Sequence, residues 1–249
     1  MESLAERRKW LDQQRRWFED EPDQTIRLTV GVDLGQLHDP SAIVVAEAGR
    51  RDTRKTEEHG RYSDGSVWVS KVYETIFRVR FVERLPLRTS FDNVGRRVRE
   101  IVEGLETLAR EERREAKVYV LVDRTGLGLP AVEGIRKELG TAVPLTGVVI
   151  TAGEQITGGL GGWEARVPKA HIVSRLRALL DTDRIELPAT PEARLLTDEL
   201  NSFQARSTLR GIRAEAEPGA HDDLVTALSL ACLLDPWGQR VRFAPSPFR

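Results

Sequence analysis

Four acidic residues stand where carboxylates could bind metal ions. Asp33 ends one apolar stretch, Asp123 ends a later one, and Asp222 and Asp223 begin a largely apolar segment near the C-terminus. Carboxylates gathered at one place repel one another unless cations lie between them. Hard oxygen ligands suit Mg²⁺ or Mn²⁺, and two such ions about 4 Å apart can activate water and stabilise the leaving oxygen of a phosphodiester. The set therefore predicts a catalytic two-metal site whose carboxylates converge within metal-bridging distance.

Each of these acids also has a simpler interpretation when it is taken alone. Asp33 and Asp123 are each followed closely by glycine, so either could serve a turn. Asp222 and Asp223 could cap a helix and complement its dipole. Two acids at strand ends together with a pair at the start of an apolar helix favour metal binding over these separate roles.

The elements that must position the acids follow from the periodicity of apolar residues. A few strands come first and helices then alternate with strands, which is typical of an α/β fold with a mixed central sheet. Short, wholly apolar strands indicate that helices flank both faces of that sheet. Strands are predicted at 26–33, 42–46, 118–123 and 143–150, and one long strand or a hairpin at 67–85. Helices are predicted at 91–114, 128–139, 168–180, 191–203 and 221–234, loops at 50–65 and 155–163, and a hairpin at 204–216.

Composition sets limits without naming a function. The chain has 249 residues, with 38 basic and 39 acidic side chains and a net charge of -1. Any nucleic-acid binding would therefore depend on local patches. The single cysteine, Cys232, excludes an internal disulfide and suits a reducing cytosol.

The organisation predicted along the chain has three parts. Residues 1–25 carry apolar residues at helical spacing among many charges and predict an amphipathic helix or linker. Residues 26–237 form the main domain, and 238–249 form a tail. No run is apolar enough to span a bilayer, and the charged N-terminus has no secretory signal.

Three motifs resemble the nuclease domain of phage terminase large subunits. They are GVDLGQLHDPSA at 31–42, VLVDRTGLG at 120–128 and GAHDDLVTAL at 219–228, and the stretch from Val167 to Ile185 is also similar to that domain. The resemblance spans about residues 28–235. It implies an RNase H-like fold of the RuvC-like superfamily and a two-metal endonuclease that cuts double-stranded DNA during viral packaging.

The resemblance also implies residue roles and partners. The metal ligands and catalytic residues would be Asp33, Asp123 and Asp222 or Asp223, with Mg²⁺ or Mn²⁺ as two bound ions. His221 would contact phosphate or only shape the helix start, and Asp39 would be an accessory acid or a turn residue. The implied partners are DNA, a terminase ATPase domain or subunit, the small terminase and the portal, in the cytoplasm of an infected or lysogenic host cell.

Basic residues near these motifs are candidates for DNA contact. They are Lys169, Arg206, Arg210 and Arg213, of which the last three lie on the predicted hairpin before the Asp222–Asp223 pair. Arginines placed there would bind phosphates without reading sequence. A solvated basic hairpin is the alternative.

Three other functions remain open at this stage. The sequence has no Gly-x-x-x-x-Gly-Lys-Ser/Thr loop, so the resemblance covers the cutting half of a terminase alone. A RuvC-like junction resolvase would use the same acids. Residues 31–35 also resemble the first phosphate loop of actin-like and sugar-kinase ATPases, although those proteins need two such lobes. A non-catalytic DNA-binding or scaffold subunit would not need clustered carboxylates.

Overall fold

The fold is built around one mixed β-sheet. The computed structural model describes residues 25–35, 39–61, 67–127, 129–160, 162–209 and 222–237. Within these residues, eight strands form a single sheet in the order β6-β7-β5-β4-β1-β2-β3-β8. Of the helix or linker predicted at 1–25, residues 1–24 lie outside the described residues, and so does the predicted tail at 238–249.

The sheet combines parallel and antiparallel pairs. β1 pairs in parallel with β4, β4 with β5, and β5 with β7, whereas β2 is antiparallel to both β1 and β3. Short strands close the two sides, because β6 pairs with β7 and β8 pairs with β3. The strands are β1 (Thr25–Asp33), β2 (Ala42–Arg61), β3 (Val67–Arg84), β4 (Glu115–Asp123), β5 (Leu145–Thr151), β6 (Thr157–Gly158), β7 (Glu164–Pro168) and β8 (Ile185–Glu186).

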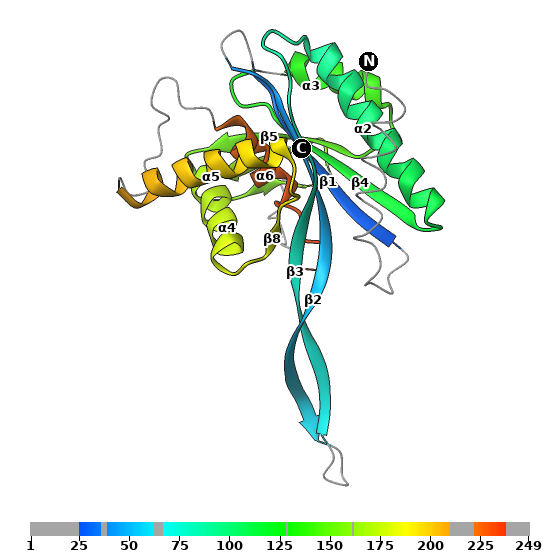
Figure 1. Ribbon diagram of the computed structural model, residues 1–249, viewed down its shortest axis with the longest axis vertical. Coiled ribbons are helices and arrows are strands. Elements are labelled where there is room, and N and C mark those ends of the chain that lie inside the picture. The colour runs from blue at the N-terminus through cyan, green and yellow to red at the C-terminus, as the bar shows by residue number, and fades with distance from the viewer. Residues whose placement is uncertain are drawn as a thin grey trace.

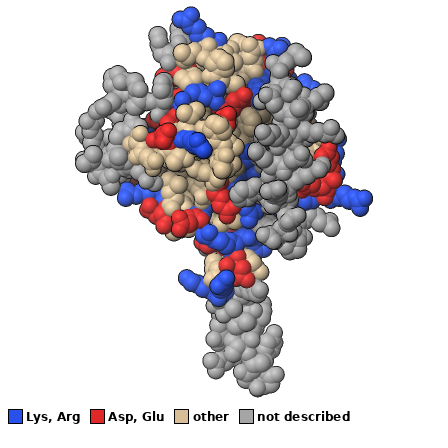
Figure 2. Space-filling model, in the orientation of Figure 1, with Lys and Arg blue, Asp and Glu red and all other residues tan. Residues whose placement is uncertain are grey.

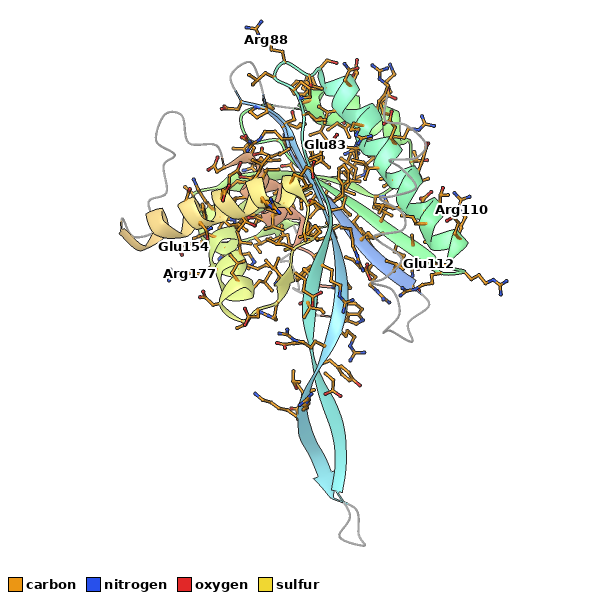
Figure 3. All side chains as sticks on the ribbon, viewed as in Figure 1. Glu83, Arg88, Arg110, Glu112, Glu154 and Arg177 are labelled. Atoms are coloured by element: carbon orange, nitrogen blue, oxygen red, sulfur yellow. The ribbon has the colours of Figure 1, made fainter. Side chains whose placement is uncertain are left out.

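Helices cover both faces of the sheet, as predicted (Figure 1). One face carries α2 (Phe91–Glu111) and α3 (Leu129–Leu139), and the other carries α4 (Lys169–Asp181), α5 (Pro191–Leu209) and α6 (Asp223–Ala231). Successive residues of β1 face opposite layers. Val30 and Val32 face α2 and α3 and pack with them. An ion pair from Arg97 of α2 to Glu83 of β3, 2.8 Å long, joins α2 to the sheet. Glu83 is labelled in Figure 3.

Two close approaches at one glycine set the position of α6. A Cβ atom on Gly31 would lie 2.0 Å from the carbonyl oxygen of Ala227 and 2.6 Å from the amide nitrogen of Ala231. The backbone of α6 therefore lies directly against β1, which only glycine permits. The apolar residues of α6, including Leu224 and Leu228, are almost fully buried.

Two predicted segments differ from the observed ones. Residues 50–61, predicted as a loop, belong to β2, which with β3 forms a two-stranded arm projecting beyond the body of the sheet (Figure 1). Residues 50–61 are charged and polar, so their sequence lacks the apolar face by which strands are recognised. The predicted hairpin at 204–216 is wrong over 204–209, which continue α5. Its remaining residues lie outside the described ones.

The predicted glycine-rich loop at 155–163 contains the short strand β6.

None of the helices in the described ranges combines the length and apolar character that a bilayer crossing requires.

Candidate metal centre

Asp33 and Asp123 are direct neighbours across two parallel strands. They are the last residues of β1 and β4, and their Cα atoms are register partners. Neighbouring strands lie about 4.8 Å apart, and partners in register point to the same face. Both side chains are partly buried. The prediction that these two acids end adjacent strands at one edge is therefore confirmed.

The third and fourth acids come from the start of α6. Asp223 is the first residue of this helix and only 7% exposed, and Asp222 precedes it as the N-cap. From the contact between Gly31 and Ala227, one helical turn of about 6 Å leads back to Asp223. Two residues along β1, roughly 7 Å, lead from the same contact to Asp33. The packing of α6 on β1 thus brings Asp223 beside the strand-end pair.

The electrostatics of Asp33 reflect this gathering. Burial raises its pKa well above the ordinary value, and the charges of Asp123, Asp223, Asp222 and Asp39 raise it further, in that order. Burial also raises the pKa of Asp123, although hydrogen bonds from Thr125 oppose the shift. One of these is the Thr125 N–H bond to Asp123 Oδ1, at 2.7 Å. The edge is therefore a place where negative charge is costly.

The carboxylates are neighbours but do not enclose a finished coordination sphere. In the part of the chain that the structure describes, no three His, Cys, Asp or Glu side chains are arranged to hold a metal ion. The predicted convergence within metal-bridging distance is therefore not met by the side chains as they stand. The donor set still fits a hard divalent cation, because every group is a carboxylate and added positive charge would relieve the repulsion that raises the pKa of Asp33.

An ion-pair network behind Asp223 was not predicted from the sequence. Arg84, the last residue of β3, forms a salt bridge with Glu199 of α5, and its Nε lies 3.9 Å from Asp223 Oδ2. Glu199 Oε2 also accepts a hydrogen bond of 3.1 Å from the Leu224 N–H. No sequence signal connects these residues, because Arg84 and Glu199 lie 115 positions apart and meet only through the fold.

Of the two accessory residues predicted around the acids, Asp39 is described and His221 is not. Asp39 is exposed in the bend after β1, and its charge contributes to the raised pKa of Asp33. This bend is held by a 3.0 Å hydrogen bond from the Gly35 N–H to the Ser41 hydroxyl. His221 lies outside the described residues.

The structure describes only some of the residues predicted to contact DNA. Lys169 is exposed at the start of α4, immediately after β7, whose carboxyl end lies at the same edge as those of β1 and β4. Arg206 is in α5, although its side chain is not described, and Arg210 and Arg213 lie outside the described residues. Over the described part of the face in Figure 2, basic and acidic side chains are interspersed.

The strand order and the acidic edge define the class of fold. The series β3-β2-β1-β4-β5, with β2 antiparallel and acids at the adjacent ends of β1 and β4, is the RNase H-like arrangement predicted from the motifs.

Solved structures similar to this chain are nuclease domains of viral terminases. The human cytomegalovirus terminase nuclease domain, soaked with Mn, is 11% identical over 89% of this chain and 93% of that one, with a TM-score of 0.49. A second structure of that domain is 10% identical over 94% of each chain, with a TM-score of 0.48. The large terminase nuclease from thermophilic phage G20c is 18% identical over 85% and 82%, with a TM-score of 0.41.

The sequence comparisons add no family. No protein-family model matches the chain, and no curated protein matches it.

Proposed function

We propose that this chain is a metal-dependent endonuclease that hydrolyses phosphodiester bonds of double-stranded DNA. The observation that carries the proposal is the register pairing of Asp33 with Asp123, beside the Asp222–Asp223 start of α6. Repulsion among these carboxylates destabilises the folded protein unless bound cations offset it, and such clusters are typical of functional sites. Binding divalent cations at a phosphodiester is the use that matches its chemistry.

Asp33, Asp123 and Asp223 or Asp222 would hold two Mg²⁺ or Mn²⁺ ions. When bound, such ions supply an activated water and stabilise the leaving oxygen of an in-line displacement. Asp33 would hold a cation in its ionised form, and a bound cation would oppose the burial and the carboxylate charges that raise its pKa. Thr125 fixes one oxygen of Asp123 through its backbone N–H.

The DNA backbone would be held by basic residues along the same edge. Lys169 stands exposed at the start of α4, where it would contact a phosphate as a point charge. We assign the same role to Arg206, Arg210 and Arg213, which precede α6 in the chain. His221 and Asp39 would be accessory to the acids.

The biological setting that we propose is viral DNA packaging. The three motifs at 31–42, 120–128 and 219–228 support it, because all three resemble terminase nuclease motifs and occur in the same order. The nuclease would act with a terminase ATPase domain or subunit, the small terminase and the portal, in the host cytoplasm.

The proposal is tested by cleavage of supercoiled plasmid DNA. The purified chain should nick and linearise the plasmid with Mn²⁺ or Mg²⁺ and should be inactive with EDTA. Asp33→Ala and Asp123→Ala should each lower the rate on the order of a thousandfold or more, while circular dichroism reports an intact fold. Asp198→Ala, which removes an exposed carboxylate from α5, is the matched control and should cut at the wild-type rate.

Cleavage of other DNA substrates and ATP binding separate the alternatives. Cleavage of a four-way junction in strong preference to linear duplex would favour a resolvase. ATP binding without cleavage would favour the actin-like or sugar-kinase-like ATPases. Metal-stimulated cleavage that survives both Asp33→Ala and Asp123→Ala would sink the site assignment.

A further inference from the structure

The turn formed by residues 86–89 lies at the same edge of the sheet as the acids. It follows β3, which ends at Arg84, and the Cα atom of Arg84 pairs in register with Ala42, which pairs with Asp33. Two strand spacings, about 10 Å, therefore separate the end of β3 from Asp33. Figure 3 shows Arg88 at the outer limit of the molecule, pointing away from the sheet. The 86–89 turn therefore stands beside anything that binds at the acids.

Hydrogen bonds brace the 86–89 turn internally and at both of its ends. The carbonyl of Pro86 accepts bonds from the Thr89 N–H, at 3.3 Å, and from the Thr89 hydroxyl, at 2.6 Å. Just before the turn, the Leu85 N–H bonds to the Ser41 carbonyl at 2.8 Å, and just after it Ser90 caps α2. A braced turn presents its side chains with little further loss of conformational entropy when it binds a partner.

The two central side chains of the turn, Leu87 and Arg88, are open to solvent. Leu87 is 56% exposed, which is high for a leucine. Arg88 is exposed as well, and among the described residues no hydrogen bond or ion pair holds its guanidinium. The nearest acid along the chain is Asp92, whose carboxylate lies against Gly134 of α3. The turn therefore offers an apolar side chain beside an available positive charge.

This pair of side chains matches the chemistry of a DNA backbone. A guanidinium binds phosphate oxygens through its planar set of donors, and an apolar side chain can pack against a deoxyribose ring. Contacts of this kind position a duplex without reading its base sequence. Because a strand advances about 3.4 Å along the helix axis per nucleotide, a contact about 10 Å from the acids lies roughly three nucleotides away.

We propose that Arg88 and Leu87 bind the DNA backbone about three nucleotides from the phosphate that is cut. Lys169 follows β7, which lies two strands beyond β4 on the other side of the acids. The ends of β3 and β7 are five strand spacings, or about 24 Å, apart. A duplex lying along the edge would meet Arg88 and Lys169 about seven base pairs apart. This inference rests on the proposed function and deepens it, because it assigns a DNA contact that flanks the same site.

The experiment compares Arg88→Gly with Arg113→Gly in the full chain. Both arginines are exposed and have positive φ, 65° for Arg88 and 56° for Arg113, but Arg113 follows the other end of α2. Figure 3 shows its neighbour Glu112 far from Arg88. Glycine accepts positive φ without strain, so both variants should fold and melt within about 3 °C of the wild type. A difference between them then reports the side chain at the acidic edge.

The first measurement is steady-state cleavage of a linear duplex with Mn²⁺. Arg88→Gly should raise the KM about tenfold and leave kcat within about twofold, because a backbone contact away from the reacting phosphate is the same before and in the transition state. Arg113→Gly should match the wild type in both constants.

The second measurement is binding of a dye-labelled duplex in EDTA, followed by fluorescence anisotropy over a series of salt concentrations. The salt dependence of the logarithm of the binding constant should fall by about 1 in Arg88→Gly, since one phosphate contact is lost. Arg88→Lys keeps the charge and should restore that dependence. Leu87→Ser removes only an apolar contact, so it should weaken binding about threefold and leave the salt dependence unchanged.

The outcomes separate this inference from the proposed function. A wild type that cuts DNA, with an Arg88→Gly variant whose KM equals that of Arg113→Gly, overturns this inference alone. A loss of kcat without a change in KM would also overturn it, because Arg88 would then act on the reaction rather than hold the backbone. A wild type that cuts no DNA with Mn²⁺ or Mg²⁺ overturns the proposed function itself.

Discussion

At the scale of single residues, Asp33 bears the electrostatic cost of the site. Burial and four neighbouring carboxylates raise its pKa well above the ordinary value. The folded state therefore binds more protons than the unfolded state as the pH rises above that ordinary value. The free energy of unfolding of the metal-free protein therefore falls as the pH rises from the ordinary pKa of an aspartate through the raised pKa of Asp33.

Replacing Asp33 by asparagine should therefore stabilise the metal-free protein near neutral pH. The substituted amide has nearly the same shape as the carboxylate without its charge, so the gain should be about 1 kcal/mol, or a melting temperature higher by roughly 2–4 °C. The measurement is thermal unfolding in EDTA from pH 4 to pH 8. The difference between variant and wild type should shrink towards acidic pH. A wild type that is the more stable protein at pH 8 would contradict this account of Asp33.

Divalent cations should stabilise the wild type more than Asp33→Asn. Mn²⁺ bound to the folded state alone raises the melting temperature of the wild type by mass action. Asp33→Asn should show a much smaller increase, because it lacks one ligand. The check is a titration of Mn²⁺ followed by differential scanning fluorimetry, with Asp198→Asn as the control. Equal increases in Asp33→Asn and the wild type would place the ion elsewhere.

At the scale of elements, the site depends on the contact between α6 and β1. Gly31→Ala would place a methyl group 2.0 Å from a backbone carbonyl of α6, and backbone cannot rotate away as a side chain can. The change should destabilise the fold by about 3 kcal/mol and move Asp223 away from Asp33. Urea unfolding and plasmid cleavage measure the two consequences.

Gly104 provides the matched control for Gly31. It lies inside α2, and within the described residues a Cβ atom there would meet no atom within 4 Å apart from its own helix backbone. Gly104→Ala should therefore leave cleavage unchanged and stabilise the protein by roughly 0.5–1 kcal/mol, since alanine favours a helix interior. If Gly31→Ala proves as benign as Gly104→Ala, α6 does not depend on its close approach to β1.

How much of the site could be predicted from sequence depends on the element. Asp33 and Asp123 were predictable because apolar strands ending in acids are local patterns. The arm formed by β2 and β3 was not predicted, because residues 50–61 are charged and no burial pattern distinguishes them from a loop. The pairing of Arg84 with Glu199 was out of reach for another reason, since it arises only when β3 and α5 meet in the fold.

At the scale of the whole molecule, the sheet and its two helical layers were predicted correctly in class. The order of strands came from motif resemblance rather than from periodicity, which does not say which strands are neighbours. The register of the strands then brings the acids together, because β1 and β4 end at paired residues. A shift by one residue would send one of the two acids to the opposite face.

The proposed domain should hold together without the residues on either side of it. Its C-terminal end is anchored at Asp235, which accepts a 2.7 Å hydrogen bond from Thr75, and at Trp237, whose ring lies under Arg27. A shortened chain of residues 25–237 should therefore melt within about 3 °C of the full chain, or about 1 kcal/mol, and retain metal-dependent cleavage. Loss of cooperative unfolding in the shortened chain would show that residues 1–24 or 238–249 belong to the domain.

The central claim is that the acids at the ends of β1 and β4 and at the start of α6 bind the catalytic cations. Anomalous diffraction from crystals grown with Mn²⁺ tests it most directly, because the signal locates each ion. The account predicts anomalous peaks within about 2.5 Å of carboxylate oxygens of Asp33 and Asp123, with Asp222 or Asp223 completing the site. Manganese bound only at other residues, in crystals of protein that cuts DNA, would contradict it.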